Sequence, residues 1–325
     1  MIATHFRQTL AGLGVVLVLI FATPAGAAPN SFPDKTVRII VPAAVGGAVD
    51  ITTRLIAEKM SKNLGQQVIV ENRAGADALI GTRYVKTSRP DGYTLLAQAN
   101  GFMLLPHLRD DTGYNPLGDF TGIGWMIRSP MVMLVRTGEP SSSVKDFIQR
   151  AKTNNFSFAS GGISAPPHVA ASMFLQKQGL KLTSALYRGN GAALPDVVAG
   201  RVTMIFDAYQ SSAPYIQSHR LKALAVTSGK RITPLQDIPT FKEQGFDYEF
   251  TLWIGLLAPT GTPADAIQKL SASLKFAMSD PELKKRFINE GSDLTFITPT
   301  GFNEYLKEEG EKMTHLVKQL NLPKQ

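Results

Sequence analysis

The sequence predicts an α/β protein made of two lobes, each a mostly parallel sheet flanked by helices. Short apolar runs alternate with amphipathic runs along the 325 residues, which is the order of strands and helices in parallel sheets. The composition is ordinary for a globular protein, with 44 % hydrophobic and 18 % charged residues. Because a single core rarely serves more than about 250 to 300 residues, two cores are favoured.

The first 28 residues differ in character from the rest. Arg7 precedes the apolar run LAGLGVVLVLIFA, and the small residues AGAA follow, which is the order of a secretory signal peptide. The apolar run is shorter than the roughly 20 residues that a membrane-spanning helix needs. We therefore expect an exported protein, cleaved near Ala27 or Ala28.

The first lobe begins with alternating strands and helices. The expected elements are a strand TVRIIV (36–41), a helix ITTRLIAEKMSKNLG (51–65), a strand QVIVEN (67–72), a helix within GADALIGTRYVKTS, and a strand YTLLAQA (93–99). Gly65 supplies a C-terminal stop for the first helix. Strands joined through helices in this way pair in parallel with right-handed crossovers.

A second set of strands and helices follows, without a detectable sequence repeat. The expected elements are MVMLVR (131–136), helix VKDFIQRAK, FSFAS (156–160), helix VAASMFLQKQ, LTSALY (182–187), helix LPDVVAG, VTMIFDA (202–208) and LKALAVTS (221–228). The chain then returns with a strand FTLWIGLLAP (250–259) and three amphipathic helices that would cover an existing sheet. We assign 29–128 and 249–325 to lobe 1, and 129–248 to lobe 2.

Charge and cysteine content exclude several classes of function. The net charge of +8 is spread along the chain, so we expect no nucleic-acid partner but a weak attraction for small anions. The chain has no cysteine, which removes disulfides, zinc-thiolate sites and thiol nucleophiles. No metal motif is present, the G-x-G of RGNGAAL is only a weak nucleotide signal, and we expect no cofactor.

Four strand ends share one composition, and each opens a helix. They are VPAAVGGAVD (41–50), NRAGADA (72–78), SGGISAPPH (160–168) and RGNGAAL (188–194). Small residues expose backbone N–H groups at helix N-termini, which suits carboxylates or phosphates. An exposed helix dipole contributes only about 0.3 to 1 kcal/mol, whereas micromolar binding needs about 8 kcal/mol. An anion would therefore have to be enclosed between the lobes.

An enzyme is the less favoured interpretation. The sequence lacks a G-x-S-x-G elbow, an H-E-x-x-H motif and a phosphate-binding G-x-x-x-x-G-K-[ST] loop. Ser160 or Ser164 with His168 and Asp207 is a remote alternative, a hydrolase that would turn over esters or amides. We expect no catalysis.

The chain resembles the periplasmic solute-binding proteins of tripartite tricarboxylate transporters, often called Bug proteins. The similarity is carried in order by FPDKTVRIIVPAAVGGAVD, LGQQVIVENRAGADALIG, RPDGYTLL, FASGGISAPPH, YRGNGAALPDVVAGRV, LKALAVTS, IPTFKEQGF and WIGLLAPTGTPADAIQKL. It implies a type II periplasmic binding-protein fold with a Venus-flytrap cleft, a monomer in the periplasm, and no catalysis. It also implies a small carboxylate ligand, delivered to membrane permease subunits; a periplasmic sensing system is the alternative destination.

The resemblance carries the candidate ligand-binding residues over to Ala43, Ala44, Val45, Gly46, Gly47, Asp50, Asp77, Ala78, Asn100, Ser160, Gly161, Gly162, Ile163, Ser164, His168 and Asp207. Two loops depart from the family. Ala43, Ala44 and Val45 replace the usual bulkier F-P-P, and Asp77 interrupts a usual G-A-G-G. Asp77 either changes the site, admitting a cationic or hydroxyl group, or caps the following helix.

Overall fold

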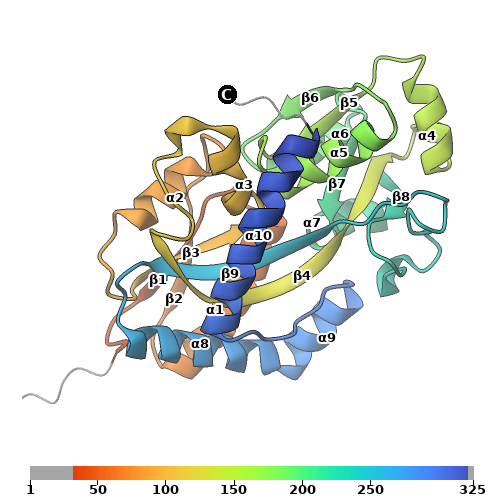
Figure 1. Cartoon of the computed structure of the whole chain (residues 1–325). Coiled ribbons are helices and arrows are strands. Elements are labelled where there is room, and N and C mark those ends of the chain that lie inside the picture. The colour runs from red at the N-terminus through yellow and green to blue at the C-terminus, as the bar shows by residue number, and fades with distance from the viewer. Residues whose placement is uncertain (1–31, 321–325) are drawn as a thin grey trace, which may run out of the picture. The chain divides into compact units, whose positions relative to one another are not determined.

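The core of the fold is one sheet, nine-stranded in the part of the chain that the structure describes. A computed structural model of the chain describes residues 32–320. In this range the strand order is β2-β1-β3-β9-β4-β7-β5-β6, with β8 paired to β4 (Figure 1). The strands are β1 (Val37–Val41), β2 (Val68–Asn72), β3 (Thr94–Ala99), β4 (Phe120–Arg136), β5 (Ser157–Ser160), β6 (Thr183–Leu186), β7 (Met204–Ala208), β8 (Leu221–Val226) and β9 (Thr251–Pro259). The predicted signal peptide lies outside the described residues.

Helices alternate with these strands and complete the α/β fold. They are α1 (Ala48–Leu64), α2 (Leu79–Lys86), α3 (Gly101–Leu108), α4 (Val144–Ala151), α5 (Pro166–Lys177), α6 (Asn190–Val198), α7 (Tyr209–Gln217), α8 (Ala264–Ser279), α9 (Pro281–Asn289) and α10 (Pro299–Leu320), with short 3-10 turns η1 (Asp110–Thr112) and η2 (Thr233–Leu235). In residues 32–320, no helix has both the length and the apolar character needed to cross a membrane.

The first part of the sheet follows the sequence pattern closely. β1 pairs in parallel with β2 and β3, as strands joined by helices should. Helix α1 ends where predicted, because Gly65 adopts a left-handed conformation with φ of 66° and its N–H donates to the carbonyl of Ser61. Ile56 and Met60 of α1 are buried on the predicted apolar face.

Strand β4 is the main difference from the predicted elements. It is 17 residues long, whereas the sequence predicts only its second half, 131–136. Its first half, FTGIGWMIRSP, contains Gly122, Gly124 and Pro130, so no continuous apolar run marks it. The first half pairs antiparallel with β9, and the second half pairs antiparallel with β7 and β8. Two antiparallel strands therefore make the sheet mixed.

The second part of the sheet surrounds β5. This short strand pairs in parallel with both β6 and β7, so the strand-helix-strand prediction also holds here. In Figure 1, β4 and β9 run side by side from the β1–β3 region toward the β5–β8 region. The carboxyl ends of β1, β2, β5 and β6 are the places where the four small-residue loops begin.

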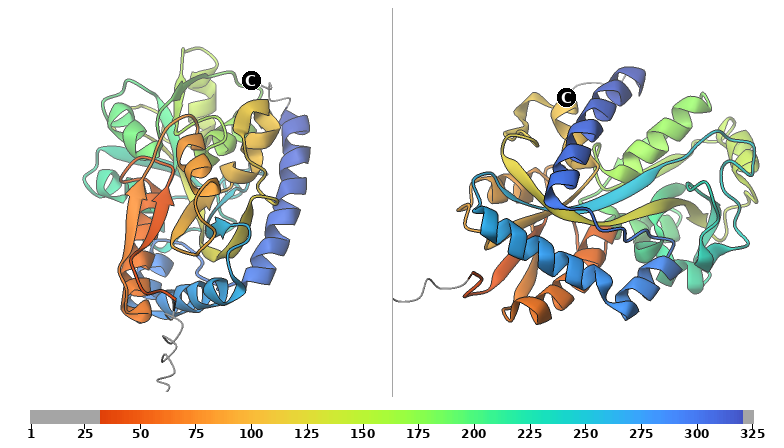
Figure 2. Two further views of the ribbon diagram at one scale, coloured as in Figure 1. Left: turned by 90° about the vertical axis from the view of Figure 1, so that its left-hand side faces the viewer. Right: turned by 60° about the horizontal axis from the view of Figure 1, so that its bottom comes forward.

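The C-terminal helices cover the sheet, as their amphipathic pattern predicts. Helices α8 and α10 both contact β4, and α8 also contacts α1 (Figure 2). Helix α9 contacts α8 and η2. Phe302 of α10 lies so close to the backbone of Gly255 in β9 that a Cβ atom there would be 2.3 Å from the ring. This contact explains why a glycine occupies a buried strand position.

Candidate functional site

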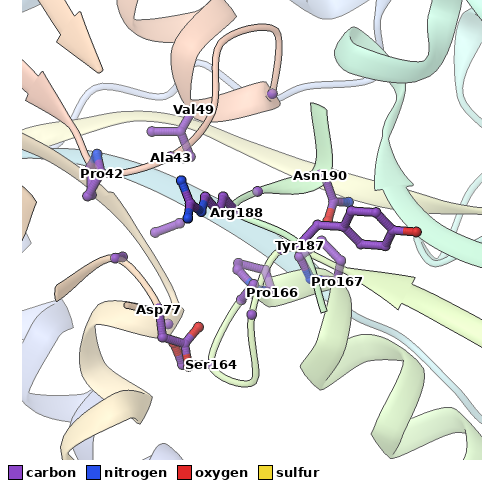
Figure 3. A pocket seen from close by; sticks show the side chains of 18 of the residues that line it. Pro42, Ala43, Val49, Asp77, Ser164, Pro166, Pro167, Tyr187, Arg188 and Asn190 are labelled. Carbon is purple, nitrogen blue, oxygen red and sulfur yellow. The ribbon is translucent and has the colours of Figure 1, made fainter. Parts of the chain in front are cut away.

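All four small-residue loops line one cavity of about 620 Å³. The β1–α1, β2–α2, β5–α5 and β6–α6 loops form most of its wall, and Figure 3 shows their side chains around the opening. Residues elsewhere in the chain complete the wall: Gln98, Ala99, Gly101, Phe102, Leu105, Arg109, Tyr114, Met131, Asp207, Ala208 and Leu252. The convergence predicted from the four loops is therefore present in the structure.

The β1–α1 and β6–α6 loops touch each other through their backbones. The N–H of Ala44 donates to the carbonyl of Arg188 at 3.1 Å. Gly189, with φ of 124°, approaches so closely that a Cβ atom would lie 2.9 Å from the Ala44 nitrogen. Gly191 would place a Cβ atom 2.6 Å from the carbonyl of Val45. Glycine is required at both positions for this approach.

Asp50 holds the first loop in shape and does not line the cavity. Its carboxylate accepts hydrogen bonds from Gly46 N–H at 3.0 Å, from Arg54 Nε at 2.9 Å and from Asn72 Nδ2 at 2.9 Å. Asn72 Nδ2 also donates to the Ala43 carbonyl at 3.1 Å. A buried carboxylate with three donors is already satisfied, so its role is to position the loop.

Asp77 reaches across the cavity. Its Oδ1 atom lies against the β5–α5 loop, where a Cβ atom on Gly162 would be 1.8 Å from it. Burial raises the pKa of Asp77, while the polar groups of Ser164 and Ile163 and the nearby charge of Arg109 lower it, and the net shift is upward. The N-cap position of α2 is Ala78, and no side chain caps that helix. The capping role considered for Asp77 is therefore wrong.

Ser160 and His168 pair beneath the β5–α5 loop. Ser160 is fully buried, and its Oγ lies 3.0 Å from Nδ1 of His168 and 3.3 Å from the carbonyl of Gly162. The His168 ring contacts Phe158 with ring centroids 5.2 Å apart. Burial lowers the pKa of His168 to about 4, so the ring is neutral at physiological pH. Neither side chain lines the cavity.

Asp207 lines the cavity at the end of β7 but does not serve His168. Its carboxylate accepts hydrogen bonds from Asn190 Nδ2 at 2.7 Å and from Ser211 Oγ at 2.6 Å. Burial raises the pKa of Asp207 to about 6, against the opposing effect of these two donors. The Oδ1 atom of Asn190 is buried without a hydrogen-bond partner among the described residues.

Two arginines bring positive charge to the cavity wall. Arg109 follows α3 and forms a two-point ion pair with Asp111, with both N···O distances 2.8 Å. Arg188 follows β6 and is exposed, and within residues 32–320 its guanidinium makes no ion pair or side-chain hydrogen bond. In Figure 3 the Arg188 side chain extends toward Ala43 and Val49 of the first loop. Arg188 therefore offers an unpaired cation to the cavity.

The cavity wall and the strand order match a known family. The family model described as "Tripartite tricarboxylate transporter family receptor" matches residues 52–322. The chain belongs to this receptor family. It resembles the solved periplasmic binding protein BugD at 33 % identity with a TM-score of 0.87, covering 90 % of this chain and 100 % of that one.

Two further solved structures similar to this receptor contain carboxylates. MatC from Rhodopseudomonas palustris, solved with malate, is 27 % identical with a TM-score of 0.83, and the match covers 88 % of this chain and 100 % of MatC. An R. palustris protein solved with adipate is 27 % identical with a TM-score of 0.85, and the match covers 89 % and 98 %. The two-lobed binding-protein fold class predicted from the sequence is thus supported by solved relatives.

The receptor's predicted site residues divide into two groups. Those in the cavity wall are Ala43, Gly47, Asp77, Ala78, Gly161, Gly162, Ile163, Ser164 and Asp207. Those outside it are Ala44, Val45, Gly46, Asp50, Asn100, Ser160 and His168. Val45 is largely exposed, and Asn100 is buried in hydrogen bonds to Glu309 and to the backbone of Thr251 and Trp253. Of the second group, Asp50, Ser160 and His168 make hydrogen bonds within or behind the loops.

Sequence reasoning missed several polar residues of the receptor's cavity, mainly Arg109, Tyr187, Arg188 and Asn190. The fourth loop, RGNGAAL, contains Arg188 and Asn190, and its composition predicts a small-residue loop without indicating a role for either side chain. An arginine directly before a glycine-rich helix start was the signal available there. No comparable signal marks Arg109, because it reaches the cavity wall only through the way α3 packs in the folded protein.

Proposed function

We propose that this receptor binds a small organic carboxylate in the cavity. The observation that carries the proposal is Arg188, a cation without an ion-pair partner in the described part of the chain, placed among loops that expose backbone N–H groups. Arginine binds carboxylates in a planar, two-point geometry. Bound malate and adipate in the two relatives support a carboxylate ligand, because those proteins share this fold.

Several weak attractions combine in this arrangement. Helices α1, α5 and α6 all begin at loops of the cavity wall, so their partial positive charges point toward a common region. Each helix end contributes about 0.3 to 1 kcal/mol when exposed, and more when water is excluded. Enclosure of the ligand by loops from both halves of the chain is what makes the sum sufficient.

We further propose that residues 29–128 with 249–325 form one lobe and 129–248 the other, and that they close around the ligand. Support comes from β4, whose first half pairs with β9 in one part of the sheet and whose second half pairs with β7 and β8 in the other. Two of the cavity loops belong to each proposed lobe. In this proposal the mature protein is a periplasmic monomer that presents its ligand to permease subunits of a tripartite transporter.

We also propose that the site is not catalytic. A serine hydrolase would need His168 hydrogen-bonded to an orienting acid and a serine facing the substrate. Here Ser160 is buried, His168 lies outside the cavity wall, and Asp207 is bonded to Asn190 and Ser211. Incubation of the purified protein with ester and amide substrates should give no hydrolysis above the spontaneous rate measured in buffer alone.

The carboxylate proposal is tested by thermal shift and calorimetry with a panel of mono-, di- and tricarboxylates. A ligand at 100 times its dissociation constant should stabilise the protein by about 2.7 kcal/mol. Arg188→Gln should lower the affinity for the best ligand by at least about tenfold, because a charge-assisted hydrogen bond is lost. Arg89→Gln, an exposed arginine outside this cavity, is the matched control. Equal affinity of both variants would refute the role of Arg188, and no binding by any acid would refute the proposal.

A further inference from the structure

Asp77 has an unusual backbone setting for a residue in a cavity wall. Ala76, Asp77 and Ala78 have φ values of 46°, 58° and 71°, and Gly75 before them has φ of 127°. Non-glycine residues seldom adopt this region, and three in succession are costly unless the surroundings stabilise them. The turn directs the Asp77 side chain away from α2 and toward the β5–α5 loop.

The Asp77 carboxylate lies against the opposite loop. The N–H groups of Ser164 and Ile163 and the Ser164 hydroxyl are near enough to lower its pKa against the effect of burial. A Cβ atom on Gly162, whose φ is 139°, would lie 1.8 Å from Oδ1 of Asp77, so glycine permits this close approach. Figure 3 shows Asp77 beside Ser164 at the edge of the cavity. The protein's own carboxylate therefore stands beside donors that would suit a ligand carboxylate.

The two charged regions of the cavity are separate. In Figure 3, the pair of Asp77 and Ser164 lies on one side, while Arg188 extends toward Ala43 and Val49. Arg109, the other cation of the wall, is paired with Asp111 and lies near enough to Asp77 to influence its charge. One region of the cavity therefore contains the unpaired cation of Arg188. The other contains the Asp77 carboxylate, which lies against the β5–α5 loop.

We propose that Asp77 is a specificity-determining residue that restricts the receptor to ligands with a single carboxylate. This inference rests on the proposed function, since it assumes that a carboxylate binds near Arg188. A second carboxylate entering the cavity would be repelled by the like charge of Asp77, which is partly desolvated and lies beside the N–H groups of Ile163 and Ser164. The far end of the ligand is then apolar, hydroxylated or cationic.

The apolar wall fits this ligand class. Phe102, Leu105, Met131, Ile163 and Leu252 contribute side chains to the same cavity. An apolar tail can fill such a surface without leaving a buried charge unpaired, whereas a second carboxylate cannot. Discrimination by a like charge is a form of specificity that works by rejecting the wrong ligand.

The test compares ligands that differ only in the second carboxylate. Hexanoate and adipate have the same chain length, and butyrate and succinate form a shorter pair. Calorimetry at neutral pH should show that the wild type prefers the monocarboxylate of at least one pair by about tenfold or more. In Asp77→Asn, which removes the charge with little change in shape, affinity for the dicarboxylate should rise by about tenfold relative to affinity for the monocarboxylate.

Two controls separate the possible outcomes. Asp247→Asn removes an equal charge from an exposed position and should leave the ratio between the two acids unchanged. Thermal unfolding of Asp77→Asn and of a second variant, Asp77→Gly, checks that the fold persists. If the affinities for both acids rise equally in the variants, Asp77 weakens the binding of every carboxylate alike, and the specificity role is refuted. A wild type that binds the dicarboxylate as tightly also refutes it. If neither acid of any pair binds to any form of the protein, it is the proposed function that fails.

Discussion

Asn100 and Glu309 are joined by a buried hydrogen bond across 209 positions of sequence, with Nδ2 of Asn100 3.0 Å from Oε1 of Glu309. The same carboxylate oxygen accepts from Nε1 of Trp253 at 3.0 Å, and Oδ1 of Asn100 accepts from the backbone N–H of Trp253. The three residues connect the end of β3, strand β9 and helix α10. The neighbours Ala99, Gly101 and Leu252 line the cavity, so the network holds this part of the wall in place.

Removal of the Glu309 carboxylate should therefore destabilise the protein. Glu309→Ala leaves the buried donors of Asn100 and Trp253 without an acceptor, and we expect a loss of about 2 to 4 kcal/mol in the free energy of unfolding. Urea denaturation followed by tryptophan fluorescence measures it. Glu308→Ala, which removes an exposed neighbour, should change the same quantity by less than about 0.5 kcal/mol. Equal effects would show that the network is not structural.

Gly191→Ala should separate the β1–α1 and β6–α6 loops. The new Cβ atom would lie 2.6 Å from the Val45 carbonyl and 3.0 Å from the Gly47 nitrogen, both of them backbone atoms. We expect a cost of about 1 to 3 kcal/mol in the free energy of unfolding, because backbone must move. Gly138→Ala is the matched control, since its nearest neighbour is the end of the Arg136 side chain at 3.7 Å. A variant as stable as the control would contradict the close approach.

His168 should make stability fall in acid. Its folded pKa of about 4 lies below the ordinary value of 6.5, so its contribution is fully present above pH 6.5 and is lost as the pH falls through 4. Between pH 7 and pH 4 the wild type should lose about 3 kcal/mol relative to His168→Gln. The measurement is a series of denaturant titrations at stepped pH. A constant difference between the two proteins would show that burial does not affect this histidine.

Asp207 should have the opposite dependence on pH. Its folded pKa of about 6 lies above the ordinary value of 3.8, so its contribution is fully present below pH 3.8 and is lost as the pH rises through 6. Relative to Asp207→Asn, the wild type should therefore lose about 2 kcal/mol between pH 4 and pH 7. The carboxyl proton can also be followed directly by infrared spectroscopy of its C=O stretch. An Asp207 carboxyl that is already ionised at pH 5 would contradict the raised pKa.

Local pattern predicted most strands well. β1, β2 and β3 begin within one residue of their predicted starts, because continuous or alternating β-branched runs bounded by turn residues are strong signals. The first half of β4 gave no such signal, since its glycines make room for Phe302, Asn303 and Leu274, which come from helices far along the chain. The strand depends on partners that a local window does not contain.

In the candidate site, too, local features could be predicted from the sequence and long-range contacts could not. The four small-residue loops were predicted because strand, loop and helix start are neighbours in sequence. The direction of each side chain was not, because one turn sends Asp50 inward to Arg54 and Asn72, while another sends Asp77 across the cavity to Ser164. These two aspartates look alike in sequence, and only their backbone angles and partners separate them.

The sequence by itself determined the family, the strand-helix order and the loops that meet at the cavity, because each of these depends on residues close together in the chain. Tertiary structure decided which polar groups serve the ligand and which serve the fold. Asn100 is held by Glu309 and Asp207 by Asn190 and Ser211, whereas Arg188 keeps an unpaired charge in the described structure. The physical reason is that a buried polar group takes whichever partner the packed elements bring within about 3 Å, and that partner can lie anywhere in the chain.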